Sequence, residues 1–231
     1  MNHQIINKAF IVALFAALFS SFASAQQTST DVPPVITIPL HQQFSEIVIE
    51  DITGKDFAIV YGYPGIWIER TDDSWASVSY NEICEKYIYF EIENGILKLK
   101  VNINFLNPYN TKWRRDWGCI NPITIRVPKK YSISSITNTG WYYTNVSLIN
   151  FKQKSLIICA SNTTNMILCD INSLIWRPYD GQPMAPKCAS YITLDSTIIK
   201  TLDIPASFSN TFKLELKKDA KIESFKYSSV K

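Results

Sequence analysis

The stretch SLIICASNTTNMILCDINSLIW, residues 155–176, decides the fold. Its three short apolar runs, LIIC, MILC and LIW, alternate with two polar segments, ASNTTN and DINS. No run reaches the length of an ordinary helix, whereas a β-solenoid stacks short apolar strands between polar corners. A β-sandwich is the alternative that remains open, although it usually has longer strands. We therefore expect short strands in this stretch, with corners at ASNTTN and DINS.

Similar apolar clusters occur on both sides of this stretch. Ile136, Leu156 and Leu174 begin comparable phrases, at a spacing of about 20 residues. Before them, residues 44–53, 56–62, 66–70 and 123–128 alternate apolar and polar side chains, which is the pattern of strands. Helical periodicity is almost absent, so the sequence predicts an all-β protein.

The clearest single element is a hairpin in YIYFEIENGILKLKVNIN, residues 87–104. Asn94 and Gly95 both tolerate the positive φ of a type I′ turn, so they predict a two-residue loop. That loop fixes the register. One face then pairs Ile92 with Leu97, Phe90 with Leu99 and Ile88 with Val101, and the other pairs Glu91 with Lys98 and Tyr89 with Lys100.

The N-terminus has the features of a secretory signal peptide. Residues 1–25 contain one Lys, an apolar run over residues 9–19 and the small residues Ala23-Ser24-Ala25. The run is too short for a permanent membrane anchor. We expect cleavage before Gln26, then a flexible segment over residues 26–37.

Charge and metal-ligand content exclude several kinds of partner. Residues 1–25 hold one of the 23 basic residues and none of the 20 acidic ones, so the exported chain is nearly neutral and gives no reason to invoke nucleic acid or an anionic membrane. His41 is the one histidine beyond the signal peptide. The five cysteines, whose spacings fit no zinc pattern, are Cys84, Cys119, Cys159, Cys169 and Cys188. We expect neither a metal nor a cofactor.

Catalytic patterns are weak. A Ser-His-Asp triad would need His41, and no Gly-x-Ser-x-Gly surrounds any serine. A polysaccharide lyase or hydrolase needs converging charged residues, for which the candidates are Asp170, Asp180, Asp195 and Arg177. Asp170 and Asp195 fit ordinary turn chemistry equally well, because Asp bonds its own backbone in corners. We expect no catalysis.

Two irregular segments concentrate aromatic and arginine side chains. Residues 107–119 contain Tyr109, Trp113, Arg114, Arg115 and Trp117, and residues 176–188 contain Trp176, Arg177 and Tyr179. Aromatic faces stack on sugars and Arg donates to polar substituents, so these loops are candidate ligand-binding sites. Alternatively, the tryptophans of these loops fold back and cover the end of the β-solenoid. Both loops end in cysteine, so a Cys119–Cys188 disulfide is conceivable.

The order of motifs resembles one family. FSEIVIEDITGKDFAIVYG (residues 44–62) is followed by IENGILKLKV (92–101) and ITIRVPKKYSISSITNTG (123–140), then by short repeated coils. This order is similar to that of the auto-transporter adhesin, head-GIN domain family, over residues 38–228. The resemblance implies a right-handed single-stranded β-helix or solenoid whose N-terminal portion contains the hairpin, with sub-parts at 38–128 and 129–228.

The resemblance also implies a function. We expect a bacterial adhesin-like protein, located in the periplasm, at the cell surface or secreted, that binds a surface glycan or protein through exposed loops. Two alternatives stay open: a carbohydrate-active β-helix enzyme of the pectinase kind, and a structural or sensory envelope protein without a ligand.

Overall fold

The computed structural model describes residues 34–51, 65–102, 122–139, 145–160, 163–177, 191–208 and 212–229. All of them belong to one compact unit, Pro33–Lys231. The expected signal peptide over residues 1–25 lies outside the described residues.

The described part of the chain is built from β-strands and two short 3-10 helices, as the all-β prediction requires. The helices are η1 (Glu82–Tyr87) and η4 (Ala206–Phe208). The strands are β1 (Val35–Leu40), β2 (Glu46–Asp51), β3 (Ile66–Thr71), β4 (Ala76–Asn81), β5 (Ile88–Glu93), β6 (Ile96–Val101), β7 (Ile123–Pro128), β8 (Ser135–Asn138), β9 (Val146–Ile149), β10 (Lys152–Ala160), β11 (Thr164–Ile167), β12 (Asp170–Arg177), β13 (Tyr191–Asp195), β14 (Ile198–Pro205), β15 (Lys213–Lys217) and β16 (Lys221–Ser228).

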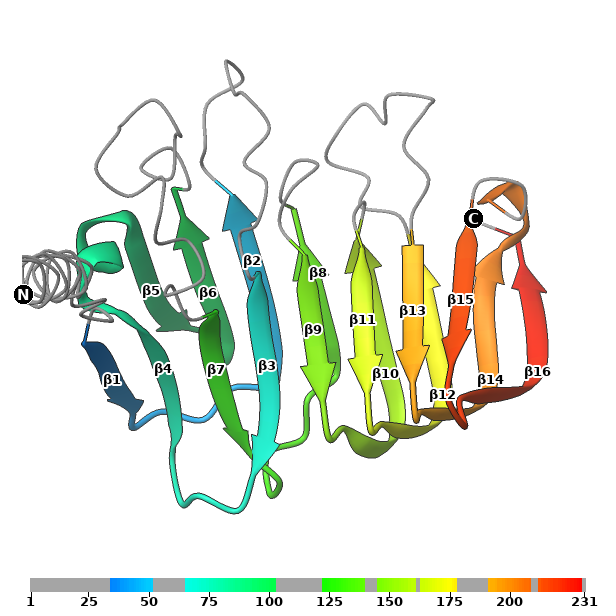
Figure 1. The fold of residues 1–231 in the computed structure, drawn as a ribbon, viewed down its shortest axis with the longest axis horizontal. Helices are drawn as coiled ribbons and strands as arrows, with labels where there is room; N and C mark the ends of the chain where they lie inside the picture. Colours follow the sequence, from blue (N-terminus) through cyan, green and yellow to red (C-terminus); the bar gives the residue numbers. More distant parts are fainter. Residues whose placement is uncertain are drawn as a thin grey trace, which may run out of the picture. The chain divides into compact units, whose positions relative to one another are not determined.

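These strands form two mixed sheets (Figure 1). Sheet A has the order β1-β4-β7-β3-β9-β11-β13-β15, and sheet B has the order β16-β14-β12-β10-β8-β2-β6-β5. Alternate residues of both sheets point into one shared core, in which Ile66, Ile68, Leu156 and Leu174 are fully buried. Each sheet therefore has an inner apolar face and an outer face.

From β8 onward the chain alternates strictly between the two sheets. Each strand pairs in parallel with the strand two places earlier, so that β10 pairs with β8, β11 with β9, and so on to β16 with β14. Figure 1 shows these strands as two layers, with short connections from sheet A back to sheet B along the lower edge. We call one strand of sheet B together with the following strand of sheet A a coil.

Each connection from sheet A back to sheet B contains one residue with left-handed backbone. These residues are Asn150, Leu168, Ser196 and Lys218, with φ between 48° and 60°. The corners also stack, because the amide of Asn150 donates to the carbonyl of Ile167 and the amide of Leu168 to that of Asp195. One left-handed residue turns the chain sharply, and the next corner satisfies its backbone groups.

The corner at DINS is a wrong prediction. Asp170–Ser173 lies inside β12, paired with β10, and the turn is made two residues earlier at Leu168. The repeat is only partly as expected. Leu156 pairs with Leu174, but Ile136 pairs with Ile158 rather than with Leu156. The coils therefore differ in length.

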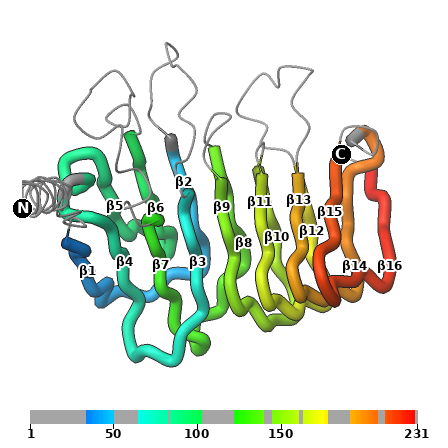
Figure 2. The backbone as a smooth tube through the Cα atoms, in the orientation of Figure 1, coloured from blue at the N-terminus to red at the C-terminus, as the bar shows by residue number. Residues whose placement is uncertain are grey.

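The N-terminal half has a different connectivity. The coil formed by β2 and β3 lies between the β6–β7 pair on one side and the β8–β9 pair on the other, with parallel pairing on both sides. Strands β1, β4 and β5 add antiparallel pairs at this end of the two sheets. The smooth trace in Figure 2 shows β2 and β3 between strands that come later in the sequence.

The predicted hairpin is confirmed as β5 and β6, residue pair for residue pair. Ile92 faces Leu97, and Tyr89 faces Lys100. Asn94 and Gly95 have φ of 52° and 77°, as a type I′ turn requires.

Other strand predictions have mixed outcomes. The segments at 44–53, 66–70 and 123–128 contain β2, β3 and β7, and residues 56–62 lie outside the described residues. Strand β4 was not predicted. Strand β1 begins at Val35, inside the segment assigned to a flexible N-terminus.

In the part of the chain that the structure describes, no helix is both long enough and apolar enough to cross a membrane.

Candidate binding site

The outer face of sheet A carries one row of side chains that crosses all eight strands. Strand pairing places them in register, and they are Thr37, Ser79, Thr124, Trp67, Ser147, Asn165, Thr193 and Glu215. We call this row the Trp67 row. Apart from the tryptophan, every member carries a hydroxyl, an amide or a carboxylate.

Trp67 is exposed because of the strand's two-residue period. Its neighbours Ile66 and Ile68 are fully buried in the core, so the side chain between them points outward. The indole remains 39% exposed. An exposed indole on a sheet is an amphipathic platform, since its ring face is apolar and its N–H can donate a hydrogen bond.

The polar members of the row are held by hydrogen bonds to each other. The amide of Asn165 donates to the Oγ of Ser147 at 3.3 Å, and the hydroxyl of Thr193 donates to Glu215 at 3.4 Å. Thr37 and Ser79 share a bond of 2.9 Å between their hydroxyls. Because each side chain stands on a paired strand, their spacing is set by the strand separation of about 4.8 Å.

A second row runs beside the first, two residues further along the strands. Next to Trp67 it contains Glu69 and Arg126, whose side chains approach to 3.9 Å, and the half-buried Ile149 and Ile167. Trp67 therefore has polar groups along its own row, and a charged pair and apolar side chains in the adjacent row.

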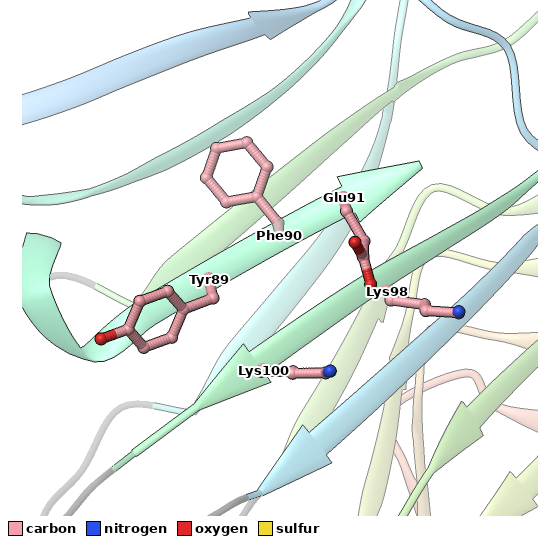
Figure 3. A pocket seen from close by; sticks show the side chains of 5 residues that line it. All are labelled: Tyr89, Phe90, Glu91, Lys98 and Lys100. Carbon is pink, nitrogen blue, oxygen red and sulfur yellow. The ribbon is translucent and has the colours of Figure 1, made fainter. Parts of the chain in front are cut away.

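A pocket of about 280 Å³ lies at the hairpin (Figure 3). It is lined by Tyr89, Phe90, Glu91, Lys98 and Lys100. In Figure 3, the carboxylate of Glu91 extends toward β6 and Lys98 points its nitrogen away from it, whereas Phe90 leaves β5 on the opposite side from Glu91.

The cations of this pocket already have acidic partners. Lys98 is ion-paired with Glu93, and this hydrogen bond lowers the pKa of the Glu93 carboxyl and raises that of Lys98. Lys100 lies 3.8 Å from Glu50. A ligand would have to displace these pairs, so the hairpin pocket is the weaker candidate.

The loop residues predicted to bind a ligand are described only in part. Tyr109, Trp113, Arg114, Trp117 and Tyr179, as well as Cys119 and Cys188, lie outside the described residues, so the loop site and the disulfide stay predictions. Trp176 is fully buried, and its ring centroid lies 5.1 Å from that of Phe212. It therefore belongs to the core rather than to an exposed loop, and because β12 lies between β10 and β14, this tryptophan does not cap an end of the stack.

Arg177 takes part in a charged cluster on the outer face of sheet B. Its Nη2 lies 3.4 Å from Asp203 and 3.2 Å from the hydroxyl of Ser228, which donates to Asp203 at 2.6 Å. Burial acts to raise the pKa of Asp203, but hydrogen bonds from Ser228 and Arg177, with the charges of Arg177 and Lys226, hold it below its ordinary value. Arg177 thus balances a buried carboxylate.

Of the candidate acids of an enzyme site, Asp195 has a structural role. Asp195 accepts hydrogen bonds from Lys218 and from Ser196, and these bonds lower the pKa of its carboxyl. Asp170 begins β12, on the other sheet, and Asp180 lies outside the described residues. Among residues with described positions, no group of three or more His, Cys, Asp or Glu side chains could hold a metal ion.

The sequence contained a signal for Trp67 that the prediction did not use. In IWIER, strict alternation places Trp67 opposite Ile66 and Ile68, and a tryptophan on the polar face of a strand is an informative exception to burial. The rest of the Trp67 row depends on non-adjacent strand pairing, which no local pattern specifies.

No family model and no curated protein matches the chain, so membership of the head-GIN family stays a prediction. Several solved structures are similar. A "putative adhesin" from Parabacteroides merdae is 7% identical, over 83% of this chain and 75% of that one, with a TM-score of 0.41. A "putative adhesin" from Bacteroides fragilis is 10% identical, over 84% and 97%, with a TM-score of 0.38. A "putative lipid binding protein" from Parabacteroides distasonis is 11% identical, over 86% and 95%, with a TM-score of 0.29. Similarity at this level assigns neither a ligand nor an activity to the chain.

Proposed function

We propose that this chain is an exported, adhesin-like binding module that recognises a glycan through the outer face of sheet A. The observation that carries the proposal is the exposed ring of Trp67 within a row of hydroxyl and amide side chains, one from each neighbouring strand. A sugar ring presents an apolar face for stacking and hydroxyl groups for hydrogen bonds, and the row offers both.

A linear glycan lying across the strands suits this geometry better than an enclosed small ligand. Such a chain meets the side chain of Thr124 on one side of Trp67; on the other side Ser147 is buried, and the next polar side chain of the row that is not buried is Asn165. Arg126 and Glu69 lie in the adjacent row, where they can donate to and accept from substituents of the same glycan.

The proposed role is binding without catalysis, and the proposed scaffold is a right-handed β-solenoid. The strict alternation of β8 to β16 between two sheets, with one left-handed residue in each connection from sheet A back to sheet B, supports a solenoid. Residues 1–25 support export. If the protein is exported and cleaved, the intact mass of the secreted protein should match a chain that begins at Gln26. A secreted product that retains residues 1–25 would contradict this prediction.

The test is a glycan-array screen of the purified protein, followed by titration of the strongest glycan against variants. Trp67→Ala should weaken binding at least tenfold, because stacking on an aromatic ring is lost, and Trp67→Tyr should recover part of it. Trp75→Ala is the matched control, because Trp75 is an exposed tryptophan outside this row that packs edge-on against His41. Melting temperature and circular dichroism establish that each variant is folded.

A second comparison separates the sheet from the loops. The double variant Trp113→Ala/Trp117→Ala changes the first aromatic loop and leaves the Trp67 row intact. If Trp67→Ala binds normally and the double variant does not, the ligand site is in the loops and the proposed sheet site is wrong. If no glycan binds the unmodified protein, the proposed function itself is wrong.

A further inference from the structure

The last strand of each sheet exposes side chains at positions that the earlier strands bury. Strands β15 and β16 are the terminal strands of sheets A and B. Their inward-facing residues Leu216, Phe225 and Tyr227 are 50%, 48% and 58% exposed. Each pairs in register with a buried residue of the neighbouring strand in its own sheet. These residues are Leu194 in β13 and Leu202 and Ile204 in β14. The terminal residues thus continue columns of the core without a further coil to cover them.

The backbone at this end is also open. Within the described residues, β15 pairs only with β13 and β16 only with β14, so the outer edge of each strand has unpaired amide and carbonyl groups. Figure 1 shows both strands at the same end of their sheets. An edge strand with exposed apolar side chains is a template for pairing with another strand.

The charge pattern of β15 favours antiparallel pairing with a second copy about a leucine, and exposure selects Leu216, which is 50% exposed, over the half-buried Leu214. Its sequence, KLELK, places Lys213, Glu215 and Lys217 on the outer face. If a second copy of β15 pairs antiparallel with the first about Leu216, Glu215 of each copy faces Lys217 of the other, and Leu216 faces Leu216. Pairing about Glu215 instead would place Glu215 against itself and Lys213 against Lys217, and like charges directly opposite are unfavourable.

We propose that two copies of this chain associate end to end through β15 and β16, with β15 pairing antiparallel about Leu216. The contact is two-fold symmetric, because the same strand is used by both copies, and it closes after two chains. It continues sheet A from one copy to the other, and it covers Leu216 and Phe225. This inference does not depend on glycan binding.

The first test is the mass of the purified protein in solution, measured by light scattering across a range of concentrations. The unmodified protein should have twice the mass of one chain. Glu215→Lys and Lys217→Glu should each shift the protein toward the mass of one chain. Each substitution places like charges directly opposite one another, at position 215 of one copy and position 217 of the other. The combined variant Glu215→Lys/Lys217→Glu should restore the dimer, because the pair is reversed in both copies.

The second test fixes the register. Directly opposite residues of antiparallel strands are close enough for a disulfide. Leu216→Cys should therefore form a covalent dimer on mild oxidation. Leu214→Cys is the matched control, since in this register Leu214 faces Lys218 of the other copy and the two cysteines are too far apart. Oxidation of the native cysteines, among which Cys159 is more exposed than the buried Cys84 and Cys169, is a background measured with the unmodified protein.

Each outcome decides the proposal. A protein that has one-chain mass at every concentration overturns it, as does a series of larger assemblies, which would indicate head-to-tail association. A dimer that forms no disulfide through Leu216→Cys, or forms one equally through Leu214→Cys, contradicts pairing about Leu216.

Discussion

Asn150 and Leu168 occupy the same corner of two successive coils, and both have left-handed backbone, with φ of 60° and 55°. Asparagine adopts this conformation readily, whereas leucine adopts it only with strain. The leucine side chain gains little in return, because it is half exposed.

Leu168→Asn should therefore stabilise the protein. Relief of backbone strain predicts a gain of about 0.5–1 kcal/mol and a rise in melting temperature of about 1–4 °C. Leu168→Ala is the control, because alanine keeps the Cβ atom and hence the strain. Thermal unfolding of both variants checks the prediction, and equal melting temperatures for them would show that the corner is not strained.

Gly65 and Gly95 both require positive φ, at 83° and 77°, but only Gly65 is crowded. A Cβ atom on Gly65 would lie 2.6 Å from the carbonyl oxygen of Asn145, which accepts the amide hydrogen bond of Ile66. A Cβ atom on Gly95 would meet nothing within 4 Å. The two positions therefore separate the cost of the backbone conformation from that of a clash.

Gly95→Ala should lower the free energy of unfolding by about 1 kcal/mol, and Gly65→Ala by roughly 2–4 kcal/mol. Urea denaturation of both variants measures the difference. Equal losses would mean that residues near Asn145 move to accept the new methyl group at little cost.

Burial raises the pKa of the Cys84 thiol and of the Cys169 thiol to about 11 each. Cys169 also donates weakly, through its sulfur, to the carbonyls of Leu148 and Ile167. Since the thiolate is the reactive form, neither thiol should react with a disulfide reagent at pH 8 until the protein unfolds. Mass spectrometry of labelled peptides identifies which cysteines react, and rapid labelling of Cys169 in the folded protein would contradict its burial.

The same pKa values predict that stability falls in alkali. Protonated thiols are favoured in the folded state, so this contribution is complete below the ordinary pKa of 9.0 and is lost as the pH rises toward about 11. Urea midpoints measured between pH 7 and pH 11 should fall above pH 9. The loss should be smaller in Cys84→Ala/Cys169→Ala, a comparison that separates the thiols from Tyr80, whose pKa is raised by burial and by Glu85 and Cys84.

The hairpin and several strands could be predicted because their information is local. Asn94-Gly95 fixes the loop length, and the loop length fixes every pair of β5 and β6. The corners could not be located in the same way. The left-handed positions are filled by residues such as Leu168 and Lys218, which carry no turn signal, and stacking against the next coil holds them in place.

The edges of the sheets were also hard to predict. Strand β1 contains Pro39, which argues against a strand in general but is compatible with an edge strand. Strand β4, ASVSYN, has small residues that give a weak pattern. For the candidate site, alternation alone would have been enough to place Trp67 on an outer face, although the prediction did not use it, whereas its neighbours Thr124 and Ser147 come from strands far away in the sequence.

The position of β2 and β3 between later strands has a consequence for how the protein folds during synthesis. Strands β2 and β3 emerge before all four of their partners, the last of which, β9, ends at Ile149. One edge of this coil remains open until β6 and β7 are available, and the other until β8 and β9 are, so the stack cannot grow from the N-terminus in the order of the sequence. The long separation of these partners predicts slow folding and a prolonged need for protection from aggregation.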